Sequence, residues 1–354
     1  MSDKMLLDAA QRLFETEHGP DAWVGPGSGA MEKGAPIWLK IEHMGLPLGL
    51  VPESAGGFGA DPLEVFETLR AAARVALPCP LAETMIAAAL ISRAGLDLPE
   101  GPASFAAPAP GVVSLTREGD GFRLRGELAR VPFARGAAAV AVTAELDGAA
   151  HLALVAPGDC TQAAGENVAG EPRDTLTVDA LLPASAVAPT ALDAARVFAL
   201  GAAVRAIGLA GALEQTTAMT VQYANDRVQF GRPIGKFQAI QQNLSVAAGQ
   251  TAAAVAAAGM AAEAAADLLD GGSDLAPIAA AKIRTGEAAG LVATIAQQTH
   301  GAIGFTLEHP LRLFTKRLWS WREEFGNEAR WSRDLGRTAL SAGQSGFWPM
   351  ISSY

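Results

Sequence analysis

Apolar positions recur at helical spacing up to about residue 105 of the chain. Loops rich in glycine and proline separate these segments, as at 47–59 and 78–80. Asp61 followed by Pro62 is typical of a helix start, because aspartate caps free backbone amides and proline suits the first turn. The pattern therefore predicts an all-α N-terminal domain.

Between about residues 110 and 190 the apolar runs become short and alternate with polar residues, which is typical of strands. Gly119-Asp120-Gly121 separates the first two runs and predicts a hairpin turn. We therefore expect a small β domain here. The expected strands are Val112 to Thr116, Phe122 to Arg125, Ala137 to Thr143, His151 to Ala156 and Thr175 to Val178.

From about residue 191 the pattern is helical again, with long alanine-rich segments at 194–229, 236–269 and 275–300. A helix of roughly 30 residues rises about 45 Å, a length that is usual in a helical bundle. Alanine faces also allow helices to approach closely. These segments predict a bundle.

The expected fold class is mostly α with a small β domain. The expected domains are an N-terminal all-α domain over 1–107, a middle β domain over 108–190 and a C-terminal four-helix bundle over 191–354.

The formal net charge of -10 argues against nucleic acid or an anionic membrane surface as the main partner. Cys79 and Cys160 are far apart and have no metal or redox spacing, so we expect neither a metal site nor a disulfide framework. A reducing, cytoplasmic setting fits best. Small-molecule chemistry or protein association is the favoured class of function.

The apolar fraction of 50% comes largely from alanine, which is only weakly hydrophobic. The longest uncharged stretch, from Lys236 to Glu263, carries glutamine, asparagine and serine side chains that are unfavourable in lipid. Met1 to Phe14 has the pattern of an amphipathic helix and not of a secretory signal. We expect no membrane span and no export signal.

The segment 223–241, which joins the first two bundle helices, contains candidate binding residues. It reads Tyr-Ala-Asn-Asp-Arg-Val-Gln-Phe-Gly-Arg-Pro-Ile-Gly-Lys-Phe-Gln-Ala-Ile-Gln. Gly231 and Pro233 stop one helix, and Gly235 lets the chain turn into the next. By itself this is a helical hairpin with a charged rim, in which Arg227 is an exposed ion-pairing residue.

As a whole the segment resembles the flavin-binding motif of the acyl-CoA dehydrogenase family almost position for position. The resemblance implies a bundle that assembles subunits, in which Arg227, Phe230 and Gln238 reach the FAD of the neighbouring subunit. Arginine suits this task because its rigid fork of donors can pair with pyrophosphate oxygens.

A second motif, at 297–309, reads Gln-Gln-Thr-His-Gly-Ala-Ile-Gly-Phe-Thr-Leu-Glu-His. Its small residues leave backbone amides open to a phosphate or a flavin adenosine, although a plain helix C-cap has the same features. The motif is similar to the family's Gln-x-x-Gly-Gly-x-Gly-Phe turn, with alanine in place of the second glycine. We expect His300 to be a turn or cap residue. The resemblance implies FAD contacts by Gln298, Thr299, His300, Gly301 and Ala302.

The expected catalytic base is missing from its usual place. The family reaction removes the α proton of an acyl-CoA thioester while hydride passes from the β carbon to the flavin, so a carboxylate base is needed. The residue that matches the usual glutamate, immediately before a glycine, is Phe325. Glu324 lies one position away and is the candidate base, with a solvated charge as its alternative. The family's other base position, near Ala218, has no carboxylate, and Glu214 lies about a turn earlier.

Three functions stay open. The first is a subunit of an FAD-dependent acyl-CoA dehydrogenase that desaturates an acyl-CoA thioester as part of a tetramer with a second dehydrogenase subunit. This arrangement resembles short bacterial members of the family, many of which act in sterol or lipid catabolism, and it implies electron-transfer flavoprotein or a similar acceptor. The second is a self-sufficient homotetramer that uses Glu324 or Glu214 as base. The third is a flavin-free scaffold subunit. The β domain favours the first, because it lacks the family's Thr-Glu-Pro and Trp-Ile-Thr patterns.

Overall fold

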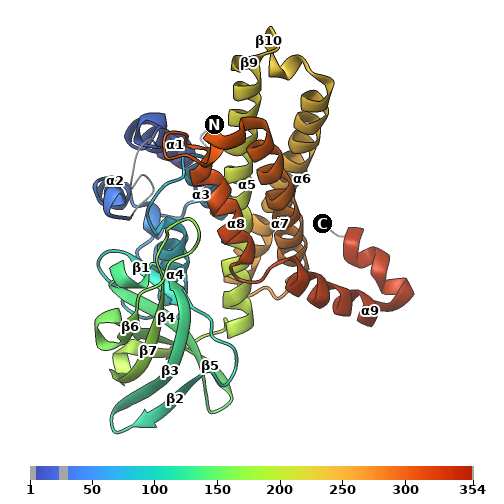
Figure 1. The fold of residues 1–354 in the computed structure, drawn as a ribbon. Helices are drawn as coiled ribbons and strands as arrows, with labels where there is room; N and C mark the ends of the chain where they lie inside the picture. Colours follow the sequence, from blue (N-terminus) through green and yellow to red (C-terminus); the bar gives the residue numbers. More distant parts are fainter. Residues whose placement is uncertain (1–4, 24–30, 353–354) are drawn as a thin grey trace.

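The computed structural model describes residues 5–23 and 31–352, and Figure 1 shows the path of the chain. The N-terminal part is helical, as predicted, and α1 packs on α3. Asp61 caps α3, since its Oδ1 accepts a hydrogen bond of 3.1 Å from the Leu63 amide. The α-helices of this part are α1 (Met5–Glu17), α2 (Met31–His43), α3 (Pro62–Arg74) and α4 (Leu81–Arg93).

The middle part contains two four-stranded sheets with strand orders β1-β4-β5-β8 and β2-β3-β7-β6. Glu118 pairs with Gly121, which confirms the predicted hairpin turn. The strands are β1 (Ala103–Ala106), β2 (Val113–Glu118), β3 (Gly121–Pro132), β4 (Ala139–Leu146), β5 (Ala149–Val155), β6 (Thr161–Ala163), β7 (Arg173–Pro183) and β8 (Val187–Pro189).

Strand β1 lies inside the range that was predicted as the helical domain. It pairs parallel with β4, whereas the other strand pairs are antiparallel. A parallel partner needs no hairpin turn, so the turn residues that reveal the other strands are missing around β1. The predicted boundary at residue 107 therefore falls just after this strand instead of before it.

The C-terminal part is a bundle of α5, α6, α7 and α8, with α9 leading away from it (Figure 1). Asp193 caps α5, because its Oδ1 accepts from the Arg196 amide at 2.9 Å. The helices are α5 (Ala194–Asp226), α6 (Gln238–Leu269), α7 (Ala276–His300), α8 (Leu311–Glu323) and α9 (Glu328–Ser352), and a two-stranded ribbon of β9 (Val228–Gln229) and β10 (Arg232–Pro233) joins α5 to α6.

Helix α5 is the central element of the molecule and packs on α3, α6, α7 and α8. Its glycines allow this close packing. A Cβ atom on Gly211 would lie 2.2 Å from the carbonyl oxygen of Arg70, and one on Gly208 would lie 3.1 Å from the Trp321 ring. Only glycine lets α3 and α8 approach α5 so closely.

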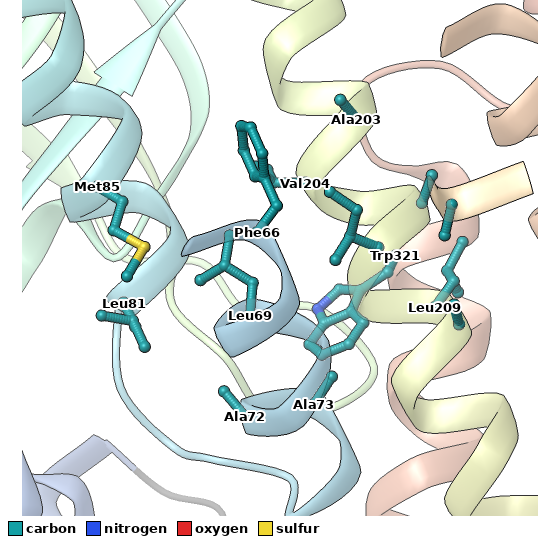
Figure 2. Packing of buried hydrophobic residues seen from close by; sticks show 14 of the residues in the cluster. Phe66, Leu69, Ala72, Ala73, Leu81, Met85, Ala203, Val204, Leu209 and Trp321 are labelled. Atoms are coloured by element: carbon teal, nitrogen blue, oxygen red, sulfur yellow. The ribbon is translucent and has the colours of Figure 1, made fainter. Parts of the chain in front are cut away.

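The N-terminal helices and the bundle share one hydrophobic core. Figure 2 shows part of it, where Phe66 and Leu69 of α3 lie beside Val204 of α5 and Trp321 of α8. A second core, which includes Leu124 of β3, lies between the two sheets. The β domain is therefore packed largely by itself, while α3 and α4 are packed as part of the bundle.

Within the described residues, α5 and α6 are long and apolar enough that length and composition alone would also suit a membrane span. The apolar window of α5 is 89% buried inside the protein, and that of α6 is 39% buried. The composition of α5 is explained by its place in the core.

Candidate functional site

The two motifs of the flavin resemblance meet at one end of the bundle. The ring of Tyr223, in the first motif, stacks on the ring of His300, in the second, with centroids 4.3 Å apart. The Tyr223 hydroxyl also donates to the His300 carbonyl at 3.4 Å. These contacts fix the hairpin between α5 and α6 against the turn that follows α7.

His300 is the last residue of α7 and is buried. Its Nδ1 lies 2.8 Å from the Ala296 carbonyl oxygen, and burial lowers the pKa of His300. The ring is therefore neutral at pH 7 and supports the turn, as expected for a cap residue.

The hairpin after α5 presents an exposed aromatic ring and cationic side chains. Phe230 has a φ of 55° and its side chain is 91% exposed. The guanidinium of Arg232 lies 4.3 Å from the Phe237 ring centroid. Among the described residues, the exposed guanidinium of Arg227 forms no ion pair. We call residues 227–238 the arm.

The turn after α7 is open to close approach by a ligand. Gln298, Gly301 and Ala302 are exposed, and Gly301 has a φ of 67° with no atom within 4 Å of the place a Cβ would take. Thr299 is buried, and its hydroxyl donates to the Ile295 carbonyl at 2.8 Å. Exposed donors, a free guanidinium and an open backbone fit the phosphate-bearing half of FAD.

Glu324 and Phe325 lie at the opposite end of α8, next to the β domain. Phe325 has a φ of 52° and its ring stacks on Phe105 of β1 at 5.4 Å and meets Phe198 of α5 edge-on at 5.7 Å. A Cβ atom on Gly201 would lie 2.3 Å from the Phe325 ring. The phenyl ring thus fills a space that α5 leaves for it, and this packing holds a backbone conformation that is unfavourable for phenylalanine.

A buried lysine holds the loop that carries Phe325. Lys282 Nζ donates to the carbonyl of Arg322 at 2.6 Å and to the carbonyl of Gly326 at 2.8 Å. Burial lowers the pKa of Lys282 to about 8. The two hydrogen bonds satisfy carbonyl oxygens on either side of Phe325 in the sequence. Helix α7, which carries Lys282, thus holds the loop in place.

The carboxylate of Glu324 is fully engaged by two arginines and an amide. Oε1 accepts from Arg173 Nε at 2.7 Å and from Asn167 Nδ2 at 2.9 Å. Oε2 accepts from Arg205 Nε at 2.6 Å and from Arg173 Nη2 at 2.9 Å. Burial by itself would raise the pKa of Glu324, but the charges of Arg205 and Arg173 outweigh it and lower the pKa to about 2. A carboxylate held in this way is a weak proton acceptor at neutral pH.

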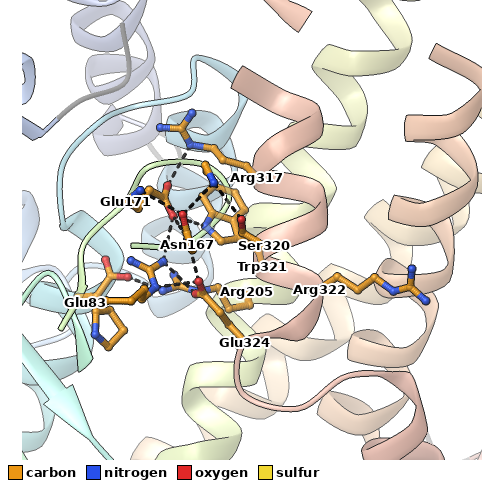
Figure 3. Close-up of polar contacts among 12 residues, drawn as sticks. Glu83, Asn167, Glu171, Arg205, Arg317, Ser320, Trp321, Arg322 and Glu324 are labelled. Carbon is orange, nitrogen blue, oxygen red and sulfur yellow. Dashed lines mark hydrogen bonds and ion pairs between the residues drawn. The ribbon is translucent and has the colours of Figure 1, made fainter. Parts of the chain in front are cut away.

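Glu324 belongs to a larger buried ion network (Figure 3). Arg205 Nη2 donates to Glu83 Oε1 at 2.6 Å, and Arg173 Nη2 donates to Glu171 Oε2 at 2.9 Å. Arg317 and Trp321 also donate to Glu171. The charged members are Glu83, Glu171, Arg173, Arg205, Arg317 and Glu324.

The network contains three carboxylates and three guanidinium groups, so its formal charge is zero. Glu83 comes from α4, Arg205 from α5 and Arg317 from α8, while Glu171 and Arg173 come from the β domain. Their side chains are between 1% and 9% exposed. The network thus links all three parts of the chain, and removal of one charged member would leave one unit of buried charge uncompensated.

The carboxylate of Glu214, the other candidate base, is also held in an ion pair. Its two carboxylate oxygens accept from Arg70 Nη1 at 2.7 Å, and Arg70 also contacts Glu67. Glu214 lies on α5 between α3 and the bundle, away from Phe325. Its role in the structure is an ion pair between helices.

The sequence interpretation missed most of the network. A signal was present, because Glu83 and Arg205 are isolated charges within otherwise apolar helical runs. Such charges are rarely buried without a partner. Their partners could not be read from the sequence, since they come from segments far apart in the chain.

A cavity of about 690 Å³ lies beside Phe325, between the β domain and the bundle. Its lining includes the three neighbouring rings of Phe105, Phe198 and Phe325, and it also reaches Arg173 and Glu324. The cavity is large enough for a planar cofactor ring. We call it the own cavity of this chain.

The own cavity and the arm lie at opposite ends of α5. Phe198 lines the cavity near the start of the helix, and Arg227 follows its last residue. The 29 residues between them correspond to roughly 44 Å at the rise of an α-helix. One dinucleotide cofactor cannot lie in the own cavity and contact the arm of the same chain.

The comparisons with known proteins agree with this fold and these motifs. Residues 192–338 match the family model described as "Acyl-CoA dehydrogenase, C-terminal domain". Acyl-CoA dehydrogenase FadE27 of Mycobacterium tuberculosis is 29% identical over an alignment of 239 positions that covers 59% of this chain and 61% of FadE27. Acyl-CoA dehydrogenase FadE34 of the same organism is 29% identical over an alignment of 348 positions that covers 94% of this chain and 46% of FadE34. The chain thus spans about half to three fifths of the length of these two relatives.

A solved structure shows the same architecture over almost the whole chain. The crystal structure of the ChsE4-ChsE5 complex from Mycobacterium tuberculosis superposes with a TM-score of 0.79 at 25% identity, and the match covers 95% of this chain and 96% of that one. The expected fold class, with N-terminal helices, a middle β domain and a C-terminal bundle, is confirmed. Residues 192–338 of this chain are thus an acyl-CoA dehydrogenase C-terminal domain, and the chain as a whole has the fold of an acyl-CoA dehydrogenase.

Proposed function

We propose that this chain is a subunit of an FAD-dependent acyl-CoA dehydrogenase that desaturates the α,β bond of an acyl-CoA thioester. In this proposal its arm completes the flavin site of a second dehydrogenase subunit, and that subunit carries the catalytic base. The observation that carries the proposal is the separation of the arm from the own cavity along α5. A cofactor-binding arm that cannot serve its own chain has a use only in an assembly.

The residues of the arm and of the turn after α7 have distinct parts in holding the cofactor of the partner. Arg227 pairs with pyrophosphate oxygens, and the exposed ring of Phe230 packs against the cofactor or the partner surface. Gln238 and Gln298 donate hydrogen bonds through their side-chain amides, and Gly301 and Ala302 offer backbone amides.

Thr299 and His300 act by fixing the turn after α7, because both side chains are buried and bonded within that helix. When bound, FAD supplies the acceptor for the hydride from the β carbon.

The base is assigned to the partner because neither of the two candidate carboxylates, Glu324 and Glu214, is suited to the task. Glu324 and Glu214 are both held by arginines, and Phe325 stands where the family usually has its glutamate. Loss of a positioned base costs about 10²- to 10⁴-fold in the proton-transfer step. A homotetramer that depends on Glu324 or Glu214 would therefore be a slow enzyme.

The proposed assembly is a tetramer with two kinds of subunit that acts in lipid or steroid catabolism in the cytoplasm. The similar solved structure is that of a complex, ChsE4-ChsE5, which supports a heteromeric partner for this chain as well. The proposed electron acceptor is electron-transfer flavoprotein or a similar protein. No nucleic acid enters the proposal, in keeping with the net charge of -10.

A visible absorption spectrum tests this function. The chain is purified once alone and once after co-expression with a candidate partner encoded beside it. We expect a stoichiometric flavin band only in the co-expressed complex, with bleaching on addition of acyl-CoA. A stoichiometric band and bleaching in the chain alone would establish the homotetramer instead. A complex without any flavin would establish the scaffold.

A further inference from the structure

Three rings meet where the two flavin motifs join, and they come from different helices or their ends. Tyr223 belongs to α5, His300 ends α7 and His309 lies just before α8. The His300 ring stacks on the Tyr223 ring at 4.3 Å and meets the His309 ring at 4.8 Å. The His309 ring also meets the Tyr223 ring edge-on, with centroids 6.2 Å apart. We call these three residues the ring cluster.

The two histidine rings of the cluster are uncharged at pH 7. Burial lowers the pKa of His300 and that of His309. Nδ1 of His300 lies 2.8 Å from the Ala296 carbonyl oxygen. Nδ1 of His309 accepts from the Leu311 amide at 3.2 Å. Neutral rings pack against one another without charge repulsion, so the ring cluster is a favourable contact at neutral pH.

The ring cluster lies directly beside one residue of each motif that the proposed function assigns to the flavin. The Arg227 amide donates to the Tyr223 carbonyl at 2.9 Å. Gly301 follows His300 in the chain. The arm folds back onto this point, since the Ile234 amide donates to the Arg227 carbonyl at 2.8 Å. A shift between the Tyr223 and His300 rings would therefore move Arg227 relative to Gly301.

Apart from the ring cluster, the two motifs are anchored on different helices. Gln297 ties the end of α7 to α8, because its Nε2 donates to Thr315 Oγ1 at 3.1 Å. Gln241 of α6 holds the arm, because its Nε2 donates to the Gly235 carbonyl at 3.0 Å. Without the rings, the turn after α7 would follow α8 while the arm would follow α6.

We propose that Tyr223 and His309 are positioning residues of the shared flavin site, which together with His300 hold the arm and the turn after α7 at a fixed spacing before the cofactor binds. This inference rests on the proposed function, because only a cofactor that contacts both motifs benefits from their alignment. A preorganised site binds more tightly, since fewer groups must be ordered on binding. If loss of the rings leaves the motifs aligned for about a tenth of the time, the apparent affinity falls about tenfold.

Substitutions of Tyr223 separate the ring from its hydroxyl group. The co-expressed complex is stripped of flavin and titrated with FAD, and flavin fluorescence reports binding. Tyr223→Ala removes the contacts with both histidine rings, and we expect the dissociation constant of FAD to rise about 10-fold. Tyr223→Phe keeps the ring and loses only the 3.4 Å hydrogen bond to the His300 carbonyl, so its affinity should stay within about twofold of the wild type.

His309→Asn separates the ring of His309 from its hydrogen bond to α8. Asparagine can still accept from the Leu311 amide, as Nδ1 of His309 does, but it has no ring. We expect this variant to lose about as much FAD affinity as Tyr223→Ala. It decides the question if Tyr223→Ala does not fold.

Phe122→Ala is the control for a general loss of stability. Phe122 of β3 packs against the core of the β domain, and the Arg117 guanidinium lies 5.3 Å from its ring centroid. Its truncation should destabilise the chain but leave the FAD affinity of the folded complex unchanged. Equal losses of affinity in Phe122→Ala and Tyr223→Ala, or full affinity in Tyr223→Ala, would overturn the proposal.

Hydrogen exchange in the absence of flavin gives a second reading. The amides of residues 227–238 and 301–309 should exchange faster in Tyr223→Ala than in the wild-type chain, because the two segments are no longer held together. Phe122→Ala should leave exchange in both segments unchanged. Wild-type exchange rates in Tyr223→Ala would show that the ring cluster does not hold the two motifs.

The inference and the proposed function fail in different ways. A wild-type complex that binds FAD only on co-expression, and keeps its affinity after Tyr223→Ala, would refute the role of the rings alone. Flavin bound stoichiometrically by the chain alone would refute the second subunit, and its loss in Tyr223→Ala but not in Phe122→Ala would still support the rings. A wild-type complex without flavin would refute both.

Discussion

At the scale of single residues, Arg205 has the most demanding place in the structure. It is buried and its guanidinium neutralises Glu83 from the N-terminal helices and Glu324 from the loop after α8. Burial by itself would lower the pKa of Arg205, but the charges of Glu324 and Glu83 outweigh it and raise the pKa. Glu83 therefore depends on Arg205 for its ion pair, while Glu324 shares Arg205 with Arg173 as its second cation.

Arg205→Met tests this dependence. Methionine keeps much of the volume but leaves Glu83 and Glu324 without their shared cation, so we expect the free energy of unfolding to fall by about 3–5 kcal/mol. Urea denaturation measures the change. The matched control is Arg123→Met, because Arg123 pairs with Glu118 and Asp179 on the solvent-exposed face of β3 and water can replace its contacts. Equal losses in the two variants would contradict the assigned importance of burial.

Arg227 gives a prediction about the cofactor. Arg227→Ala removes a charged donor from the arm, and a hydrogen bond to a charged group contributes about 1.5–3 kcal/mol. We expect the assembled complex to bind FAD roughly 10- to 100-fold more weakly, measured as flavin retained after gel filtration. Arg117→Ala, on the exposed strand β2 far from the arm, should retain its flavin. Unchanged flavin content in Arg227→Ala would count against the role of the arm.

At the scale of elements, α5 and the loop after α8 fit together through one glycine. Gly201 has no Cβ, and the Phe325 ring occupies the space where one would lie. Gly201→Ala should lower the free energy of unfolding by about 1–3 kcal/mol, because the ring must shift. In a protein that already carries Phe325→Ala, Gly201→Ala should cause a smaller loss of stability than in the wild type, since the clash is then absent.

A second helical glycine provides the control for this pair. Gly249 lies in α6 with no atom within 4 Å of the position of a Cβ, so Gly249→Ala should leave stability unchanged or raise it by up to about 1 kcal/mol. Thermal unfolding of Gly201→Ala, Phe325→Ala, their double variant and Gly249→Ala measures these differences. Strictly additive losses for Gly201→Ala and Phe325→Ala would show that the two residues do not interact.

The elements were largely predictable because their signals are local. Alanine-rich periodicity revealed α5, α6 and α7, and the turn at Gly119-Asp120 revealed the first hairpin. The end of α5 was predicted at residue 229 and lies at Asp226, since Val228 and Gln229 pair with β10 instead of continuing the helix. Strand β1 escaped prediction because its partner is distant in sequence and parallel.

The candidate site was predictable only in part, for the same physical reason. The arm and the turn after α7 are continuous motifs, so resemblance to the family located them. The ion network brings Glu83, Arg173, Arg205 and Glu324 together from segments that are up to 241 residues apart. No periodicity or local propensity encodes such a meeting, which follows only from packing of the three domains.

At the scale of the whole molecule, the ion network makes stability depend on acidity. The pKa of Glu324 is lowered to about 2 in the folded chain, while an unfolded glutamate titrates near pH 4.3. The unfolded chain therefore binds the proton first as the pH falls. The stabilisation is fully present above about pH 4.3 and is lost as the pH falls towards 2.

We expect the wild-type chain to lose on the order of 3 kcal/mol of stability through this group between pH 5 and pH 2. Denaturant unfolding at a series of pH values measures the slope. Glu324→Gln removes the titrating group, so its slope should be smaller even though its stability at pH 7 is also lower. Parallel pH curves for the two proteins would show that another group controls acid unfolding.

Helix α5 also determines the orientation of the arm relative to the rest of the chain. An α-helix turns about 100° and rises 1.5 Å for each residue, so one alanine inserted near its exposed end, beside Val221, would point the arm away from a fixed partner. Four inserted alanines would restore nearly the original direction with a displacement of about 6 Å. Association with the partner would thus weaken and recover with the period of the helix as the number of inserted residues increases. The sequence of the arm itself would remain unchanged.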